Sequence, residues 1–293
     1  MLTTAQKSIF DEHGWVRVPR MLPETDVHSV LDRVWDDLEQ RCRIPRDDPE
    51  AWPETKPKGF NRLMRSGAFE PTCGSAVQAA IDEFLEPGHW EKPSPWGALL
   101  LTFPAAGPWF LPNHSWHMDL QIAVDPASET NPGVQVFAIL EPLAARGGAT
   151  IALAGSHRLV RHLARQPELI GEGRSKDITN AVKRAAPNLR DLWSRDLGGV
   201  RDSGVNREDR YLANPVDVSG IPVQAVEFTG DPGDVIFMHP WIIHTASSNR
   251  GDRPRIVITE RVRRQDGRDG HNVPAGQDKQ NDDDRNTIRS EET

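Results

Sequence analysis

From Gly97 onward the sequence consists of short apolar runs separated by turn residues, and this pattern limits the fold more than any other feature. Runs of about four to eight residues suit strands and are too short for most helices. Gly, Pro, Asn and Asp residues stand between the runs and favour chain reversals. The runs predicted as strands are Gly97–Phe103, Leu120–Val124, Val134–Leu140, Ala149–Leu153, Ala225–Phe228, Val235–Met238 and Arg255–Val262. Antiparallel strands with such short connections are typical of a mainly β double-stranded β-helix, the jelly-roll or cupin-like fold.

Helical patterns flank these strands. Near the N-terminus we predict a helix that Thr4 caps and Gly14 ends, followed by a short strand over Trp15–Pro19. Apolar residues recur at three- and four-residue steps from Pro23 to about Arg41, which predicts a longer helix. The stretch Pro45–Pro71 shows no period and predicts an irregular wrap over the surface. A further short helix is predicted over Ser75–Leu85.

Length and composition favour a single large domain. The 293 residues have a hydrophobic fraction of 37%, which is enough for one core. We expect this domain to cover residues 1–263, with a helical insertion at about 159–215. Residues 264–293 are polar and contain almost no apolar side chains, so they predict a disordered tail.

Charge and cysteine content exclude several classes of function. The 35 basic and 43 acidic residues give a net charge of -8, without the basic excess that nucleic acid or anionic lipid would require. No stretch of about 18 apolar residues predicts a membrane span, and no apolar signal segment opens the chain. Cys42 and Cys73 are too few for a disulfide framework. We therefore expect a cytoplasmic protein with a small-molecule partner, whose oligomeric state the sequence does not indicate.

Two segments contain residues that together suit a metal site. His117 and Asp119 are two positions apart, so on a strand both side chains would project from one face, although any solvent-facing strand can show this pair. His244 follows an apolar strand, and a polar loop then leads to Arg255 at the start of the next strand. Two imidazoles and one carboxylate form the facial triad of non-haem Fe(II) oxygenases, which leaves three metal positions open. A buried arginine nearby would pair bidentately with a dicarboxylate.

Over most of Thr3–Val262 the chain resembles the phytanoyl-CoA dioxygenase family of Fe(II)- and 2-oxoglutarate-dependent oxygenases. The segments that carry the resemblance are Gly14-Trp15-Val16, His117 to Leu120, Gly155-Ser156-His157-Arg158 and Gly233-Asp234 to Arg255. The resemblance implies that His117, Asp119 and His244 are the iron ligands. It also implies that Arg255, eleven residues after His244, binds the distal carboxylate of 2-oxoglutarate, with Arg253 as the alternative by proximity.

Some positions depart from the family's pattern or suggest other roles. Ala154, Gly147 and Ala246 differ from residues that are frequent in relatives, and Ala246 lacks a hydroxyl that would contact the cosubstrate. The remaining polar residues near the motifs are interpreted as stabilising turns: His157, Arg158 and His239. Three tryptophans could line a substrate pocket but are interpreted as core: Trp109, Trp116 and Trp241.

The resemblance implies hydroxylation of a small organic substrate by O2, with decarboxylation of 2-oxoglutarate to succinate. Asp119 argues against halogenation, because a halogenase needs the carboxylate position free for chloride. The alternative is a cupin-like protein that binds a metal such as zinc for non-oxidative chemistry, or that only binds a ligand. Arg255 distinguishes the two, because a non-oxidative site has no reason to bind a dicarboxylate. No pattern names the substrate, and the basic residues of the insertion are interpreted as solvated rather than as a CoA site.

Overall fold

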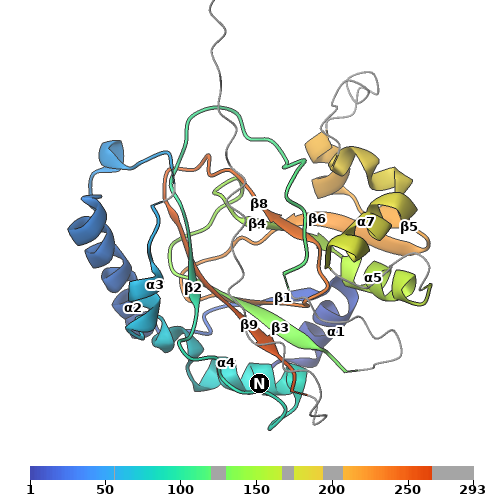
Figure 1. Ribbon diagram of the computed structural model, residues 1–293, viewed down its shortest axis with the longest axis horizontal. Helices are drawn as coiled ribbons and strands as arrows, with labels where there is room; N and C mark the ends of the chain where they lie inside the picture. The colour runs from blue at the N-terminus through green and yellow to red at the C-terminus, as the bar shows by residue number, and fades with distance from the viewer. Residues whose placement is uncertain (56, 120–129, 167–174, 194–206, 266–293) are drawn as a thin grey trace, which may run out of the picture.

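Two antiparallel sheets form the centre of the protein, whose computed structural model describes residues 1–55, 57–119, 130–166, 175–193 and 207–265 (Figure 1). One sheet has the strand order β1-β7-β3-β9-β2 and the other has the order β5-β6-β4-β8. The strands of the first sheet are β1 (Trp15–Val18), β2 (Ala98–Thr102), β3 (Gly133–Ile139), β7 (Val235–Met238) and β9 (Arg255–Arg263). The strands of the second are β4 (Thr150–Ala154), β5 (Val216–Val218), β6 (Ile221–Glu227) and β8 (His244–Ala246). The predicted jelly-roll class is confirmed.

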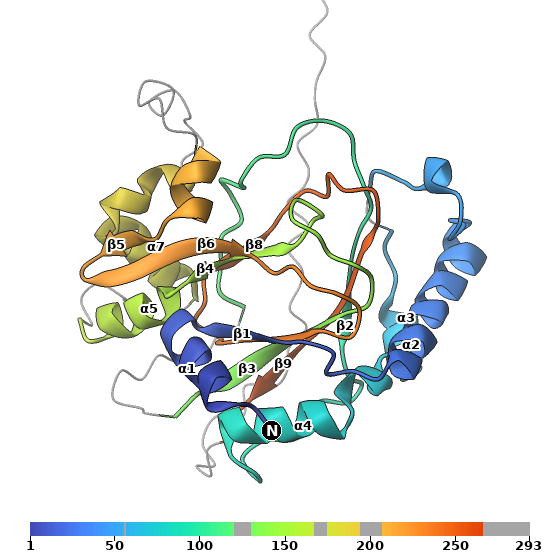
Figure 2. The same ribbon diagram turned by 180° about the vertical axis from the view of Figure 1, so that it is seen from behind.

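Side chains of the five-stranded sheet alternate between its two faces, as the pleat of a strand requires. On β3, Val134 and Val136 pack into the core beneath the N-terminal helices, whereas Phe137 and Ile139 point toward the other sheet. Helix α4 (Ser75–Leu85) packs against β3 on the face to which Val134 and Val136 point. Residues of helix α2 (Glu24–Asp37) belong to the same apolar core, so we call this the helix-covered face (Figure 2). The space between the sheets therefore has its own apolar core, into which the site residues described below project.

The described parts of the insertion after β4 are largely helical, as the sequence predicts. Helices α5 (Ser156–Ala164) and α7 (Ser175–Ala185) lie together at the end of the molecule opposite α2 (Figure 1). Their apolar faces pack on the outer face of the four-stranded sheet, for example against Ile151 and Leu153 of β4. The short helical turns that complete this layer are η4 (Pro187–Leu192) and η5 (Asp209–Ala213).

Local capping chemistry sets the helix ends and corrects two predicted boundaries. Helix α1 (Thr4–His13) is capped by Thr3 rather than Thr4, because the Thr3 hydroxyl accepts from the Gln6 N–H and the Gln6 side chain accepts from the Thr3 N–H. Gly14 ends this helix with a φ of 77°, as predicted. The helix predicted to reach Arg41 is α-helical only to Asp37 and continues as the π-helical turn η1 (Leu38–Cys42).

Other predictions need correction or lie outside the described residues. The stretch 45–71 contains the short helices η2 (Pro49–Ala51), α3 (Asn61–Arg65) and η3 (Glu70–Cys73, which ends just beyond it), and its Ala68 and Phe69 are fully buried. Two short strands, β5 and β8, were not predicted. Arg264 belongs to the folded part rather than to a tail, because its guanidinium donates to the Leu85 carbonyl. The strand predicted at 120–124 and the tail from residue 266 lie outside the described residues.

Candidate metal centre

Backbone pairing brings His117 and His244 side by side. The His117 N–H donates to the His244 carbonyl at 3.0 Å, and the His244 N–H donates back to the His117 carbonyl at 2.9 Å. His244 is further tied to the sheet because β8 pairs with β4, opposite Ala152. His117 lies in this isolated bridge rather than in a regular strand, which corrects the expectation that His117 and Asp119 share a strand face.

Asp119 completes a compact cluster with the two histidines. Its Oδ1 lies 3.2 Å from His117 Nε2, and its Oδ2 lies 3.3 Å from His244 Nε2. One potential ligand atom from each of the three residues lies within 4.8 Å of the other two. The His117 side chain is 50% exposed, whereas the His244 side chain is 6% exposed. Within the described part of the chain, the cluster is therefore open to solvent on the His117 side and covered on the His244 side.

Backbone carbonyls orient both imidazoles. His117 Nδ1 lies 2.6 Å from the Ser115 carbonyl oxygen, and His244 Nδ1 lies 3.1 Å from that of Ile242. A carbonyl can only accept a hydrogen bond, so each Nδ1 must be the protonated nitrogen that donates to it. Each Nε2 then points toward Asp119 as a potential metal-binding nitrogen, in the arrangement typical of metal-ligating histidines.

The charges around Asp119 favour its ionised form. Burial alone would raise the pKa of the carboxyl, but hydrogen bonds from His117 and His244 and the charge of Arg261 hold it well below its usual range. Burial lowers the pKa of His117, whereas its hydrogen bonds with Asp119 and Ser115 raise it, and the net direction is upward. A set of two imidazole nitrogens and one carboxylate oxygen suits a divalent first-row transition metal. The residues present therefore fit a metal ion.

Arg255 is buried between the two sheets, and the described part of the chain gives it no ionic partner. It is 4% exposed, and its Nη2 donates to the Thr150 hydroxyl on β4 at 2.7 Å. Its Nε has no partner, and among the described residues no carboxylate pairs with the guanidinium. Burial lowers the pKa of Arg255 to about 10. An unpaired buried cation is costly, so this position suits an anionic ligand group.

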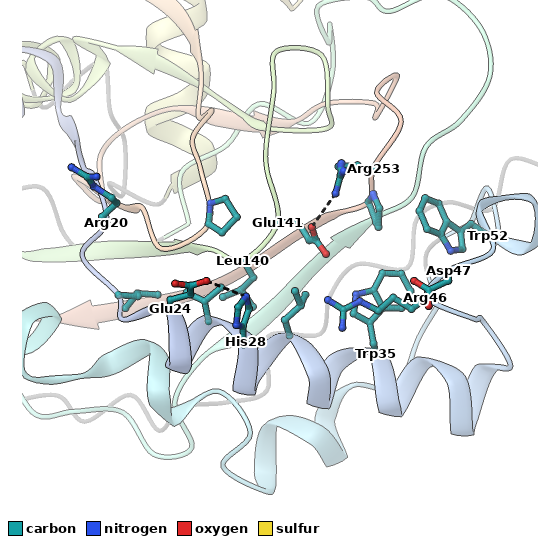
Figure 3. Close-up of a pocket in the computed structure, with 15 residues that line it drawn as sticks. Arg20, Glu24, His28, Trp35, Arg46, Asp47, Trp52, Leu140, Glu141 and Arg253 are labelled. Carbon is teal, nitrogen blue, oxygen red and sulfur yellow. Dashed lines mark ion pairs between the residues drawn. The ribbon is translucent and has the colours of Figure 1, made fainter.

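Arg253, the alternative to Arg255, lies toward the other side of the five-stranded sheet. Its side chain is 61% exposed and pairs with Glu141 at 3.9 Å, as Figure 3 shows. Both residues line a cavity of about 610 Å³ beside α2, together with Trp35 and Leu140 of the helix-covered core. This cavity is thus separated from the cluster by the sheet.

Five of the other residues singled out in the sequence, two histidines and three tryptophans, are buried, whereas Arg158 is half-buried and Ala246 is exposed. His157 and His239 are buried and lie near each other, with ring centroids 5.1 Å apart, and neither belongs to the cluster. The backbone N–H of Trp241 donates to His239 Nδ1, which fits a turn-stabilising role. The three tryptophans considered for a pocket lie in the core beneath the insertion: Trp109, Trp116 and Trp241.

Two residues that contact Asp119 were missed in the sequence. Gln135 Nε2 donates to Asp119 Oδ2 at 2.8 Å, and Arg261 Nη2 lies 3.0 Å from Asp119 Oδ1. Gln135 interrupts an otherwise apolar strand, and Arg261 shares the parity of Arg255 on β9, so both had a weak signal. Only the pairing of β3 with β9 brings them together, since Gln135 is directly opposite Arg261.

The family model described as phytanoyl-CoA dioxygenase (PhyH) matches residues 10–257. The chain belongs to this family. Membership in the phytanoyl-CoA dioxygenase family places it among the 2-oxoglutarate-dependent oxygenases, whose cofactor is Fe(II). No curated protein matches the chain. Among the described residues, no helix is both long and apolar enough to cross a membrane.

Solved structures resemble this phytanoyl-CoA dioxygenase family member at low sequence identity. The epimerase SnoN in complex with Fe3+, alpha-ketoglutarate and nogalamycin RO is 14% identical over 89% of this chain and 82% of its own, with a TM-score of 0.51. HygX from Streptomyces hygroscopicus with nickel and 2-oxoglutarate bound is 16% identical over 90% and 88%, with a TM-score of 0.47. AviO1 from Streptomyces viridochromogenes Tue57 is 14% identical over 90% and 96%, with a TM-score of 0.49. The likeness to SnoN concerns the fold.

Proposed function

We propose that the protein is an Fe(II)- and 2-oxoglutarate-dependent dioxygenase that hydroxylates a small organic substrate. His117, Asp119 and His244 hold the iron, and Arg255 binds the distal carboxylate of 2-oxoglutarate. The observation that carries the proposal is the convergence of two imidazole nitrogens and one carboxylate oxygen within 4.8 Å, in a chain of this family.

The protein's contribution at the metal is orientation. Hydrogen bonds to the Ser115 and Ile242 carbonyls direct the Nε2 atoms of His117 and His244 to the same side, where Asp119 meets them. When bound, Fe(II) together with 2-oxoglutarate and O2 supplies the oxidising chemistry, and 2-oxoglutarate leaves as succinate. The exposed side of His117 is the direction from which a substrate can approach, because the His244 side is covered.

Arg255 binds the cosubstrate from within the fold. The hydrogen bond from its Nη2 to the Thr150 hydroxyl orients the guanidinium. The Nε, which has no partner among the described residues, and the remaining N–H groups can then donate to a carboxylate. Arg255 lies on the same face of β9 as Thr259, whose hydroxyl lies 3.3 Å from the Gln135 amide nitrogen that contacts Asp119. The arginine and the metal ligands thus share the space between the sheets.

Two features disfavour other activities and substrates. Asp119 supplies the carboxylate at the position that a halide would need, so halogenation is disfavoured. The net charge of -8 gives no basic surface excess for nucleic acid. A small organic substrate therefore fits best.

The test is an anaerobic titration with Fe(II) followed by 2-oxoglutarate. We expect a weak visible charge-transfer band on addition of 2-oxoglutarate, and succinate once O2 is admitted with a substrate. Asp119→Ala is the matched control and should give neither. Metal binding without 2-oxoglutarate binding would instead favour the non-oxidative metal protein.

A further inference from the structure

Asp119 is the member of the cluster whose position depends most on side-chain contacts. His117 and His244 are tied to each other by two backbone hydrogen bonds, and His244 also belongs to β8. For Asp119, the described residues provide no backbone hydrogen bond. The described contacts that set the direction of its carboxylate are those of the side chains on its two oxygens.

Gln135 and Arg261 contact the carboxylate from adjacent strands. They are directly opposite each other in the β3–β9 ladder, and Arg261 binds Oδ1 while Gln135 binds Oδ2. Arg261 is 42% exposed and has a long, flexible side chain. Gln135 is only 2% exposed, so its amide is confined by the surrounding core. Arg261 therefore stabilises the negative charge of the Asp119 carboxylate, whereas Gln135 fixes the orientation of that carboxylate.

The orientation of the Gln135 amide follows from its neighbours. Its nitrogen must face Asp119, because its oxygen would repel the carboxylate. The same nitrogen lies 3.3 Å from the Thr259 hydroxyl. Among the described residues, the Gln135 Oε1 is then left buried without a partner, which is an energetic cost. An apolar residue like the neighbouring Val134 and Val136 would avoid this cost, so packing alone does not account for glutamine here.

We propose that Gln135 is a positioning residue that fixes the rotation of the Asp119 carboxylate for metal binding. The inference rests on the proposed function, because it assigns Asp119 as a metal ligand. A metal site needs a carboxylate oxygen in a defined direction, and hydrogen bonds to ligating residues supply that direction in metalloproteins. Gln135 supplies it from the rigid core of β3.

The test compares two variants that each remove one contact of the same amide. Gln135→Met keeps the length of the side chain but has no N–H donor. We expect the Kd for Co(II) to rise by roughly 10–100-fold, the range usual for groups that hydrogen-bond to metal ligands. The absorption bands of bound Co(II) should also shift, because the coordination geometry changes. Thr259→Val removes only the 3.3 Å contact and should leave both the Kd and the spectrum unchanged.

A second substitution at Gln135 and a measurement of folding distinguish weaker Co(II) binding from loss of the fold. Gln135→Glu keeps the size and shape but places an acceptor against Asp119, so it should also weaken Co(II) binding. Thermal unfolding of the metal-free proteins shows whether each variant folds. If the wild type binds Co(II) and a folded Gln135→Met binds it equally well, the positioning role is wrong. If Thr259→Val weakens binding as much as Gln135→Met, strand packing explains the effect and the inference fails. If the wild type itself binds no Co(II), the proposed function fails instead.

Discussion

Arg255 differs from every other residue of the site because its charge is buried without a counter-charge in the described part of the chain. Arg255→Ala should therefore raise the KM for 2-oxoglutarate far more than it changes iron binding. Removing one partner of a buried charge pair costs about 2–5 kcal/mol, because the other charge is left unpaired. This corresponds to between about one and four decades in affinity. Succinate formation at varied 2-oxoglutarate concentration measures the effect.

Arg253→Ala is the control for this prediction. Its side chain is exposed and pairs with Glu141 beside α2, so its removal should leave the KM for 2-oxoglutarate unchanged. If Arg253→Ala raises this KM and Arg255→Ala does not, the cosubstrate contact belongs to Arg253. If neither variant responds, the oxygenase assignment is weakened in favour of a non-oxidative metal site.

Asp119→Ala should abolish metal-dependent turnover while the protein stays folded. The carboxylate contacts His117, His244, Arg261 and Gln135. Arg261 is 42% exposed and can be solvated when its partner is lost, and the Gln135 amide keeps the Thr259 hydroxyl as a partner. No apolar side chain is removed from the core. We expect no succinate above background and a nearly unchanged melting temperature of the metal-free protein. Succinate formation at the wild-type rate would contradict the assignment of Asp119 as a ligand.

At the residue scale, the identity of the metal-binding and cosubstrate-binding residues could be predicted from the sequence, whereas the side chains that contact them could not. His117, Asp119, His244 and Arg255 were selected by residue type, by spacing and by the family resemblance, and the structure gathers the first three into one cluster. Gln135 was missed because a single polar residue in a strand is read as a solvent-facing position. Its contact with Asp119 depends on the fold around β3, which local sequence does not contain.

At the scale of elements, the junction of α1 with α5 gives a prediction about Gly14. This residue ends α1 with a positive φ, and a Cβ there would overlap His157 Nδ1 and the Ile242 side chain. A left-handed conformation costs a residue with a Cβ about 1–2 kcal/mol, and overpacking typically adds about 1–3 kcal/mol. Gly14→Ala should therefore lower the free energy of unfolding by more than about 2 kcal/mol in urea denaturation.

Gly220→Ala separates the two contributions. Gly220 has a φ of 78°, close to that of Gly14, but a Cβ there meets nothing within 4 Å. Only the conformational cost of about 1–2 kcal/mol should remain. Equal losses in the two variants would show that the contact of Gly14 with His157 does not contribute.

Elements with a strong apolar pattern could be predicted, and short ones could not. The helix predicted over Ser75–Leu85 has those bounds in the structure, as does the strand Val235–Met238. Strand β8 consists of three residues, His244 to Ala246, and is a strand only because β4 lies beside it. Its pairing is set by tertiary contacts, so no local period indicates it.

At the scale of the whole molecule, the fold class could be predicted but the strand order could not. Alternating apolar runs and short turns indicate two packed antiparallel sheets. The order β1-β7-β3-β9-β2 places the N-terminal strand beside β7, more than two hundred residues later. This neighbourhood depends on long-range pairing. The same strand order pairs β9, which carries Arg255 and Arg261, with β3, which carries Gln135.

The buried histidines His157 and His239 should make the stability of the whole protein depend on pH. Burial, together with the charges of Arg158, Arg161 and His13, lowers the pKa of His157 to about 4, although its hydrogen bond with the Asp11 carbonyl acts in the raising direction. Burial also holds the pKa of His239 well below its usual range, with His157 and Arg161 acting in the same direction. In the unfolded chain both imidazoles have a pKa near 6.5. The unfolded state therefore binds more protons between about pH 6.5 and 4.

The sign follows from this difference in bound protons. The stability from the two neutral imidazoles is fully present above about pH 6.5 and is lost as the pH falls, by up to about 1.4 kcal/mol per pH unit for each. His117 contributes with the opposite sign, because its pKa is raised in the folded state. The measurement is therefore the change in the free energy of unfolding between pH 7 and pH 5, obtained by urea denaturation and compared between each variant and the wild type. His157→Gln should be less dependent on pH than the wild type, whereas His28→Gln, at an exposed position on α2, should match it. If His157→Gln keeps the wild-type slope, the protonation of His157 does not control acid stability, and the interior around Gly14 takes up a proton without unfolding.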